Sequence, residues 1–482
     1  MTAESKARTG ARARAESYSP GLERFLEVYL DARLLPYSPA DSRVMAELER
    51  CVGCGNCLSV CPVVGAAAAH PYPGPRTVAT GLSRSLPEFW ASADTAGFCT
   101  TCMACEEACP ADVPVWRGIL MMRAKDYEQR AREGQDAFSR IKRLAVDLFA
   151  EGKLAQAARW GAALQGLAMR RTTSGEMKAR VALPLGSLAS RVVPPLARRP
   201  LVEEFPEVVP GEVPDGPRVA VFAGCLYNYA YTDTGRALVG VLRRHAREVV
   251  VPAGQVCCGA PVFYSGDLPA ARRLAAENAR VFEAAGADFV VTACATCGDV
   301  LANEYPVLFE RPAEDAAAAV RSLAARVRDV HAFLTAEVAF RAPDAPVAAL
   351  PGATSAAPSG ALTITVHDPC HLNRGQGVAA EVRRLLRSIP GVTVREMARP
   401  DACCGGAGSF SLDHYDLAAA IRDGKVTDIE ATGADIVVTG CPSCRMHIAD
   451  GLERAGKGRP VRHLVDLLEA AYLAEDSGRR RG

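Results

Sequence analysis

The sequence predicts an α+β protein: a small helical, cysteine-rich module near the N-terminus, followed by two repeated α/β domains. Three observations predict this architecture. Two groups of four closely spaced cysteines precede residue 110, a pattern of five cysteines occurs twice in the second half, and apolar runs alternate with helical segments around that pattern. Alternation of strands and helices is typical of α/β domains with a parallel sheet.

Length and composition fit a globular protein. The 482 residues suffice for about three domains, and the hydrophobic (49%) and charged (23%) fractions are ordinary for a globular chain. A net charge of +1 gives no reason to expect a nucleic-acid partner. No segment has the roughly 18 apolar residues that cross a bilayer, and the basic N-terminus has no apolar stretch of a secretory signal behind it. We therefore expect a cytoplasmic protein, either free or peripheral on the inner face of the membrane, where thiols stay reduced.

The N-terminal cysteines match a cluster-binding motif twice. The pattern C-x2-C-x2-C-x3-C-P, which binds a [4Fe–4S] cluster, describes both groups. Because the fourth cysteine of such a run serves the other cluster, we predict that cluster 1 is bound by Cys51, Cys54, Cys57 and Cys109. Cluster 2 is then bound by Cys99, Cys102, Cys105 and Cys61. A pair of structural zinc sites is the alternative, although zinc favours two separated C-x2-C pairs.

Helical pattern surrounds this module. Apolar residues recur with helical spacing over 22–34, and residues 116–169 are rich in Ala, Leu, Arg and Glu without proline, which favours helix. The proline-rich stretch 183–217 is predicted to be a linker. The basic residues at both ends are predicted to be disordered and solvated.

The second half of the chain contains an internal repeat. Each copy has a single cysteine, then Cys-Cys-Gly, then C-x2-C at nearly equal spacing. The cysteines are Cys225, Cys257, Cys258, Cys294 and Cys297 in the first copy, and Cys370, Cys403, Cys404, Cys441 and Cys444 in the second.

Secondary-structure signals place these thiols at element boundaries. Apolar runs at 218–224, 288–293, 362–366 and 435–440 are predicted to be buried parallel strands. Helices are predicted directly after Cys294 and Cys441, and over 270–285 and 416–432. The thiols would lie at strand ends and helix N-termini, where the positive end of the helix dipole favours thiolates.

The Cys-Cys-Gly step requires a kinked chain. Adjacent side chains of a strand point to opposite faces, so both thiols reach one cluster only if the backbone turns. Gly259 and Gly405 permit that turn because glycine accepts a positive φ. Five thiolates exceed what a cubane needs, so either the cluster is not an ordinary cubane or one cysteine is free for redox chemistry. A buried structural thiol set and a zinc site are the other interpretations.

The predicted domains follow from these patterns. They are an N-terminal extension (1–40), a dicluster ferredoxin-type domain (41–125), a helical region with linker (126–217), a first cysteine-rich domain (218–340), a linker (341–361), a second cysteine-rich domain (362–472) and a basic tail (473–482).

The repeated pattern resembles the cysteine-rich (CCG) domain found in heterodisulfide reductases. Two ferredoxin motifs followed by two such domains are similar to the D-type subunit of heterodisulfide reductase. They are equally similar to the iron–sulfur subunits of glycolate oxidase, D-lactate dehydrogenase and anaerobic glycerol-3-phosphate dehydrogenase. The resemblance covers about residues 45–472 and implies a noncubane [4Fe–4S] cluster at each five-cysteine set, clusters 3 and 4.

Details of the motifs divide between these relatives. Residues 98–113 are similar to the second ferredoxin motif of heterodisulfide reductases, whereas 366–372 and 403–410 are similar to glycolate- and lactate-oxidising relatives. Those relatives often lose a cysteine from the last C-x2-C, whereas this chain keeps Cys441 and Cys444. That departure weakens the hydroxyacid assignment and favours a complete second cluster site.

The resemblance implies an electron-transfer subunit of a multi-subunit oxidoreductase. A flavoprotein dehydrogenase partner of the glycolate or D-lactate type would supply electrons, and a quinone, a membrane cytochrome or another carrier would receive them. The chain carries no flavin or nicotinamide fingerprint, and Gly405–Gly408 lies inside the cysteine motif. The alternatives are a catalytic disulfide reductase that uses noncubane clusters, and a zinc scaffold.

The histidines are weaker signals. His367 and His371 flank Cys370, and they either tune a cluster or relay protons, or else cap the turn between strand and helix. The sequence favours the capping role for His367 and neither role for His371. His414 and His447 are predicted to be surface or packing residues.

Overall fold

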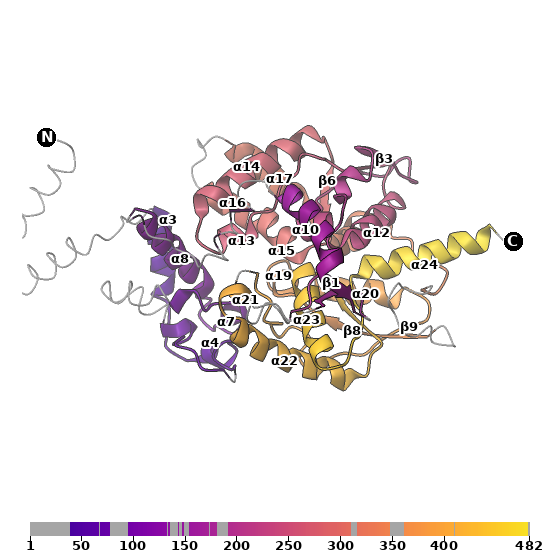
Figure 1. Cartoon of the computed structure of the whole chain (residues 1–482). Coiled ribbons are helices and arrows are strands. Elements are labelled where there is room, and N and C mark those ends of the chain that lie inside the picture. The colour runs from indigo at the N-terminus through magenta and orange to yellow at the C-terminus, as the bar shows by residue number, and fades with distance from the viewer. Residues whose placement is uncertain are drawn as a thin grey trace, which may run out of the picture.

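The computed structural model describes residues 39–66, 68–77, 95–132, 134, 143, 147–148, 154–172, 174–180, 191–309, 316–347, 361–408 and 410–480. Within these residues an N-terminal helical module lies beside two α/β domains (Figure 1). The predicted helix over 22–34 and most of the predicted linker 341–361 lie outside the described residues. No helix among the described residues has the length and apolar character needed to span a membrane.

The N-terminal module is built from short helices around two cysteine loops. Its helices are α3 (Pro39–Leu48), α4 (Asn56–Ser59), α7 (Ala104–Glu107) and α8 (Val115–Arg132). One face of α8 is buried through Trp116, Ile119 and Met122. Because this face carries the large apolar residues, α8 holds the second cysteine loop against the rest of the molecule.

A helix and a small hairpin follow the module. The helix is α10 (Leu154–Ala168), and the antiparallel hairpin consists of β1 (Met169–Arg171) and β2 (Met177–Ala179). The prediction of helix within 116–169 is confirmed for α8 and α10. Gln165 of α10 donates a hydrogen bond to the carbonyl of Pro194 and accepts one from the amide of Leu196, which fixes α10 on the following segment.

The first α/β domain has a five-stranded sheet in the order β3-β5-β4-β6-β7, in which only β3 is antiparallel. Its strands are β3 (Val208–Pro210), β4 (Arg218–Val221), β5 (Glu248–Val250), β6 (Phe289–Thr292) and β7 (Val327–Asp329). Its helices and helical turns are the 3-10 turn η2 (Leu201–Glu203), α11 (Leu226–Tyr229), α12 (Thr232–Arg243), α13 (Ala260–Phe263), α14 (Leu268–Ala284), α15 (Ala295–Asp299), the π-helical turn η3 (Val300–Glu304), α16 (Tyr305–Leu308), α17 (Ala317–Arg326), α18 (Val330–Ala332) and the π-helical turn η4 (Phe333–Glu337).

The second α/β domain repeats this topology. Its all-parallel sheet has the order β11-β10-β8-β9, which matches β7-β6-β4-β5 of the first domain. Its strands are β8 (Leu362–His367), β9 (Val392–Val394), β10 (Ile436–Thr439) and β11 (Val461–Arg462). Its helices are α19 (Cys370–Asn373), α20 (Ala379–Arg387), α21 (Phe410–Asp413), α22 (Tyr415–Thr432), α23 (Pro442–Arg454) and α24 (Leu464–Arg479).

Each predicted parallel strand and helix of the repeat is present, but two boundary predictions need correction. The predicted linker 183–217 contributes β3 to the first sheet, because the apolar residue Val209 is buried against β5. The predicted basic tail 473–482 overlaps α24, and the prediction that its basic end is disordered is wrong for Arg479, which lies in that helix. Arg479 near the end of that helix is paired with Glu475 at 2.5 Å.

Each α/β domain packs one of its helices against a helix of the other domain. Helix α24 of the second domain packs along α12 of the first, where Arg244 pairs with Glu469 at 3.0 Å (Figure 1). In the reciprocal position, α18 of the first domain packs on α20 of the second. Because the same contact forms in both directions, the carboxyl ends of the two sheets face a shared centre.

Candidate metal centres

The structure sorts the eight N-terminal thiols into two groups. Burial raises the pKa of Cys57, and the neighbouring Cys51, Cys54 and Cys109 thiols raise it further. Burial likewise raises the pKa of Cys61 to about 12, with Cys102 and Cys99 as its charged neighbours. Burial also raises the pKa of Cys105, and the nearby Cys99, Cys102 and Cys61 thiols raise it further. The fourth cysteine of each motif therefore lies with the first three of the other motif, and the ligand sets themselves remain a prediction.

The loops between these cysteines need left-handed backbone. In the first motif glycine supplies it, with φ of +73° at Gly53 and +84° at Gly55. In the second motif the matching positions are Thr101 (φ +54°) and Met103 (φ +60°), which are strained for residues with a Cβ. The turn brings the amide of Thr101 to within 3.3 Å of Cys99 Sγ. Inward-pointing amides of this kind form an anion-binding concavity of the type that Fe–S sites use.

In both cysteine-rich domains, the two adjacent cysteines of the Cys-Cys-Gly step contact different partner cysteines. Cys257 contacts Cys225, while Cys258 contacts Cys297. Cys403 contacts Cys370, while Cys404 contacts Cys444. The predicted kink is confirmed, because φ is +85° at Gly259 and +75° at Gly405.

Helix N-termini hold the C-x2-C cysteines. Cys294 is the N-cap of α15, and its Sγ accepts a hydrogen bond from the amide of Cys297 at 3.4 Å. Cys441 is the N-cap of α23. Hydrogen bonds with Cys294 and Cys444 lower the pKa of Cys441 well below its usual value. In the first domain, hydrogen bonds with Cys257 and Cys297 lower the pKa of Cys258 to about 5. This donor set suits a metal–sulfide group, since thiolates are the ligands that iron–sulfur clusters use.

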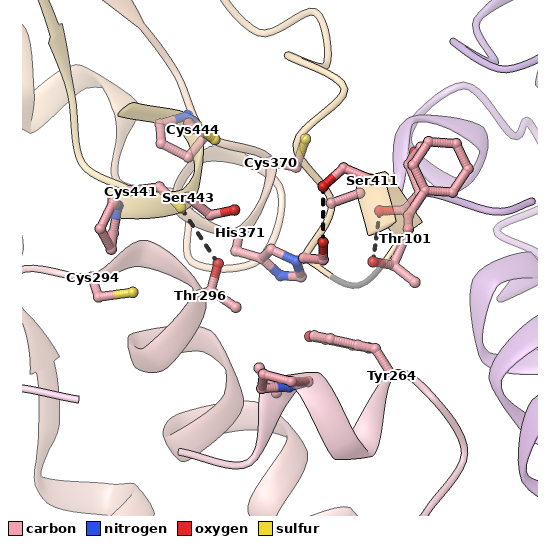
Figure 2. A pocket seen from close by; sticks show the side chains of 18 of the residues that line it. Thr101, Tyr264, Cys294, Thr296, Cys370, His371, Ser411, Cys441, Ser443 and Cys444 are labelled. Carbon is pink, nitrogen blue, oxygen red and sulfur yellow. Dashed lines mark hydrogen bonds between the residues drawn. The ribbon is translucent and has the colours of Figure 1, made fainter. Parts of the chain in front are cut away.

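Contacts between thiols of different cysteine sets connect three of the four sets. Cys102 of the dicluster domain contacts Cys370 and Cys403 of the second cysteine-rich domain, and these contacts lower its pKa well below its usual value. Cys441 of the second domain contacts Cys294 of the first. The hydroxyl of Thr296 lies 3.6 Å from Cys441 Sγ, as Figure 2 shows. All 18 cysteines fall within the described residues, and all are free thiols.

Comparisons with known proteins agree with this arrangement. The model of a 4Fe-4S dicluster domain matches residues 47–113, and that of a cysteine-rich domain matches residues 219–302 and 364–449. One of the subunits of the fumarate reductase (CoM/CoB) of Methanothermobacter marburgensis is 31% identical over 450 residues, which cover 90% of this chain and 74% of that protein. The chain belongs to the family of the glycolate oxidase iron–sulfur subunit and the D-type subunit of heterodisulfide reductase.

Further members of this family resemble different lengths of the chain. The probable glycolate oxidase iron–sulfur subunit of Bacillus subtilis is 29% identical and covers 88% of this chain and 94% of its own length. Lactate utilization protein A of Bacillus cytotoxicus is 30% identical over 253 residues, which cover 52% of this chain and 99% of that protein. As a member of the family, the chain carries iron–sulfur clusters and serves in electron transfer. This assignment does not favour the zinc scaffold.

A cavity of about 310 Å³ lies where the cysteine sets of this family member meet. Its wall includes thiols from three sets, among them Cys99, Cys225, Cys294, Cys370 and Cys441. Tyr264 and His371 line the same cavity and lie near one another, with ring centroids 5.4 Å apart (Figure 2). The cavity therefore has direct access to several thiols and to one imidazole.

His371 lies in a dyad that joins the two cysteine-rich domains. Its Nδ1 is 2.6 Å from Oδ2 of the buried Asp299 in α15. Burial opposes protonation of the imidazole, but the hydrogen bond to Asp299 raises its pKa. The sequence did not single out Asp299, because its partner comes from the other repeat and no local spacing relates them.

The other histidines divide between the predicted roles. The ring of His414 stacks on Phe98 at 4.1 Å, and the buried His447 bonds to the carbonyl of Ala418 at 3.2 Å, so both contribute to packing. His367 is also buried and lies beside Cys404 and Cys444. The capping role favoured for His367 has no support, because neither nitrogen of its ring has a hydrogen bond to a helix N-terminus.

Proposed function

We propose that this chain is an electron-transfer subunit in which the dicluster domain exchanges electrons first with the second cysteine-rich domain and then with the first. One observation carries the proposal: Cys102 contacts Cys370 and Cys403, whereas Cys441 contacts Cys294. Clusters bound at these sets would take up and release single electrons. The spatial order of the sets therefore differs from their order in the sequence.

The proposed ligands are the predicted ones. Cys51, Cys54, Cys57 and Cys109 would hold cluster 1, and Cys99, Cys102, Cys105 and Cys61 would hold cluster 2. The five-cysteine sets of the first and second cysteine-rich domains would hold clusters 3 and 4. Since Cys102 also contacts the second domain, cluster 2 is the one that would communicate with cluster 4.

Side chains of α8 fix the dicluster domain on the first cysteine-rich domain as well. The buried guanidinium of Arg123 donates to the carbonyl of Cys99 at 2.6 Å and to that of Tyr264 at 2.9 Å. Tyr127 donates to Asp267 at 2.9 Å. These bonds hold the cluster 2 loop beside the shared cavity, which Cys99 and Arg123 both line.

The partner is proposed from the relatives. Glycolate oxidase and lactate utilization appear in the names of relatives, and this chain has no fingerprint of an organic redox cofactor. We therefore propose a flavoprotein subunit that oxidises a 2-hydroxyacid as the donor. A quinone, a membrane cytochrome or another carrier would be the acceptor, and the chain would work in the cytoplasm, free or peripheral on the inner membrane face.

Anaerobic purification followed by cysteine substitution tests this proposal. The wild-type chain should contain about 16 iron atoms and should not oxidise lactate or glycolate by itself. Cys102→Ser should block electron arrival at both cysteine-rich domains after rapid reduction of the dicluster domain. Cys225→Ser should remove only the last step. Oxidation of a hydroxyacid by the isolated chain, or normal arrival of electrons in Cys102→Ser, would contradict the proposal.

A second candidate function is disulfide reduction in the central cavity. The observation that favours it is the cavity of about 310 Å³, whose wall includes Cys225, Cys294 and Cys441 next to the His371–Asp299 dyad. Cleavage of a disulfide consumes two electrons and two protons, so a cavity with both thiol and imidazole groups fits. A cluster-replete, pre-reduced protein should then release two thiols per disulfide from a small alkyl disulfide. No turnover with such disulfides rules this function out.

A further inference from the structure

The two cysteine-rich domains differ at one position beside their thiols. His367 lies three residues before Cys370, and Phe222 lies three residues before Cys225. The strand pairing agrees, because His367 is paired with Thr439 of β10 and Phe222 directly follows Val221, which is paired with Val291 of β6. The first domain therefore places a hydrocarbon ring where the second places an imidazole.

The hydrogen bonding of His367 determines which nitrogen carries the proton. Nδ1 lies 3.2 Å from the carbonyl oxygen of Pro400, so Nδ1–H is the donor. Nε2 then has a free lone pair. This atom is buried and has no hydrogen-bond partner, and the residue is only 1% exposed.

The ring of His367 lies beside two thiols of the second set. His367, Cys404 and Cys444 each offer one ligand atom, and the three atoms lie within 4.8 Å of one another. A buried ring nitrogen without a hydrogen-bond partner is unfavourable, and a metal ion held between it and the two sulfur atoms would satisfy it. Imidazole and thiolate together are suitable ligands for iron.

We propose that Nε2 of His367 is a ligand of the iron that Cys404 and Cys444 hold, so that the second domain has a nitrogen-ligated cluster site and the first does not. This inference rests on the proposed function only in requiring a cluster at the second five-cysteine set. It adds a ligand that the cysteine pattern does not contain.

The consequence is a difference between clusters 3 and 4. A neutral imidazole beside the five thiolates gives that iron a nitrogen donor of the kind found in Rieske centres, without adding negative charge to the site. Lys425 favours reduction of cluster 4, because its buried ammonium contacts the carbonyl oxygens of Arg399 and Pro400 and its charge acts on Cys403 and Cys404. The first domain has the neutral Asn278 at the matching point of α14, where it binds the carbonyl of Cys257. Cluster 4 is therefore the more easily reduced of the two.

The test is pulsed EPR on full-length protein that is purified anaerobically and labelled with ¹⁵N only in histidine. Wild type should show hyperfine coupling from one directly bound histidine nitrogen at some stage of a redox titration. His367→Phe, which introduces the residue of the first domain, should lose that coupling. His447 lies near Cys404, and the first domain has Val300 at the matching position. His447→Val should therefore keep the coupling.

Further variants separate a ligand from a structural residue. His367→Cys restores a ligand atom, so it should retain wild-type iron content, lose the nitrogen coupling and lower the reduction potential of one cluster. Absence of histidine coupling in a wild-type protein with about 16 iron atoms would overturn the inference but not the proposed function. Persistence of the coupling in His367→Phe, or a loss of zinc rather than iron from that variant, would also overturn it. Protein without iron and sulfide would instead defeat the proposed function.

Discussion

Arg374 of the second cysteine-rich domain forms an ion pair with Glu107 of the dicluster domain, with 2.5 Å between Nε and Oε2. The same guanidinium also binds the side chain of Asp401. It is nearly buried, with 9% of its side chain exposed, and its charge acts on the thiol of Cys370. One side chain thus touches both domains at the point where two thiol sets meet.

The charge of Arg374 should favour reduction of cluster 4. Arg374→Met removes a buried positive charge beside Cys370, so we expect a lower reduction potential for that cluster and slower transfer from the dicluster domain. EPR-monitored redox titration and rapid-mixing kinetics measure the two effects. Glu107→Gln is the matched control, because Glu107 is 57% exposed and a pair at the surface contributes only about 0–1 kcal/mol. An equal shift of potential in both variants would contradict this role.

The two kink glycines should differ in their tolerance of alanine. A Cβ at Gly405 would lie 2.3 Å from the carbonyl oxygen of Ala418, whereas the nearest atom to a Cβ at Gly259 is 3.5 Å away, on Leu274. Both substitutions place alanine at positive φ, which costs about 1–2 kcal/mol, but only Gly405→Ala also forces the backbone apart.

The iron content of the two variants measures this difference. Gly405→Ala should fall from about 16 to about 12 iron atoms per chain through loss of cluster 4. Gly259→Ala should retain most of cluster 3. Equal iron contents in the two variants would show that the close approach to Ala418 does not decide assembly.

Sequence patterns predict the repeated part of the fold well, because buried parallel strands are continuous apolar runs. The run at 288–293 became β6, and its counterpart at 435–440 became β10. Strands β3, β5, β7, β9 and β11 were not predicted, since two or three residues carry no periodic signal. The end of α24 was misjudged because its charged residues suggested a solvated tail, whereas Glu469 and Asp476 bind Arg244 of the first domain.

The cysteine sets could be predicted from spacing, but their mutual placement could not. The contact of Cys102 with Cys370 and the dyad of His371 with Asp299 join segments from different domains. Such contacts depend on how whole domains pack, and no local pattern encodes that packing. A comparison of Phe222 with His367 across the repeat would have identified the unusual histidine, since the cysteines of the two sites correspond one to one.

Asp450 should be important for the stability of the second domain. The buried carboxylate accepts hydrogen bonds from Arg422 at 2.5 Å, from Tyr415 at 3.1 Å and from the amide of Val192 at 2.8 Å. Asp450→Asn leaves the buried guanidinium of Arg422 without its main counter-charge, which should lower the free energy of unfolding by about 3–5 kcal/mol. Anaerobic urea titration measures this loss. Glu277→Gln, which removes a solvent-exposed partner of Arg280, should leave the titration unchanged. A small effect of Asp450→Asn would mean that water reaches Arg422.

Glu304 should make the stability of the protein depend on pH. Burial raises the pKa of this carboxyl group to about 7, although Arg117 at 3.5 Å opposes the shift. In the unfolded chain its pKa is about 4.3. The folded state therefore binds more protons between these values, and the free energy of unfolding falls as the pH rises from about 4.3 to 7.

Glu304→Gln removes this contribution, since the amide stays neutral. The variant should match wild type near pH 5 and exceed it at pH 8 by on the order of 2–4 kcal/mol in anaerobic urea titrations. Other buried carboxyl groups titrate in both proteins, so the difference between the two curves isolates Glu304. Glu283→Gln, which changes an exposed carboxylate that pairs with Arg326, should show no such pH-dependent gain. A constant difference between Glu304→Gln and wild type from pH 5 to 8 would show that Arg117 keeps Glu304 ionised throughout.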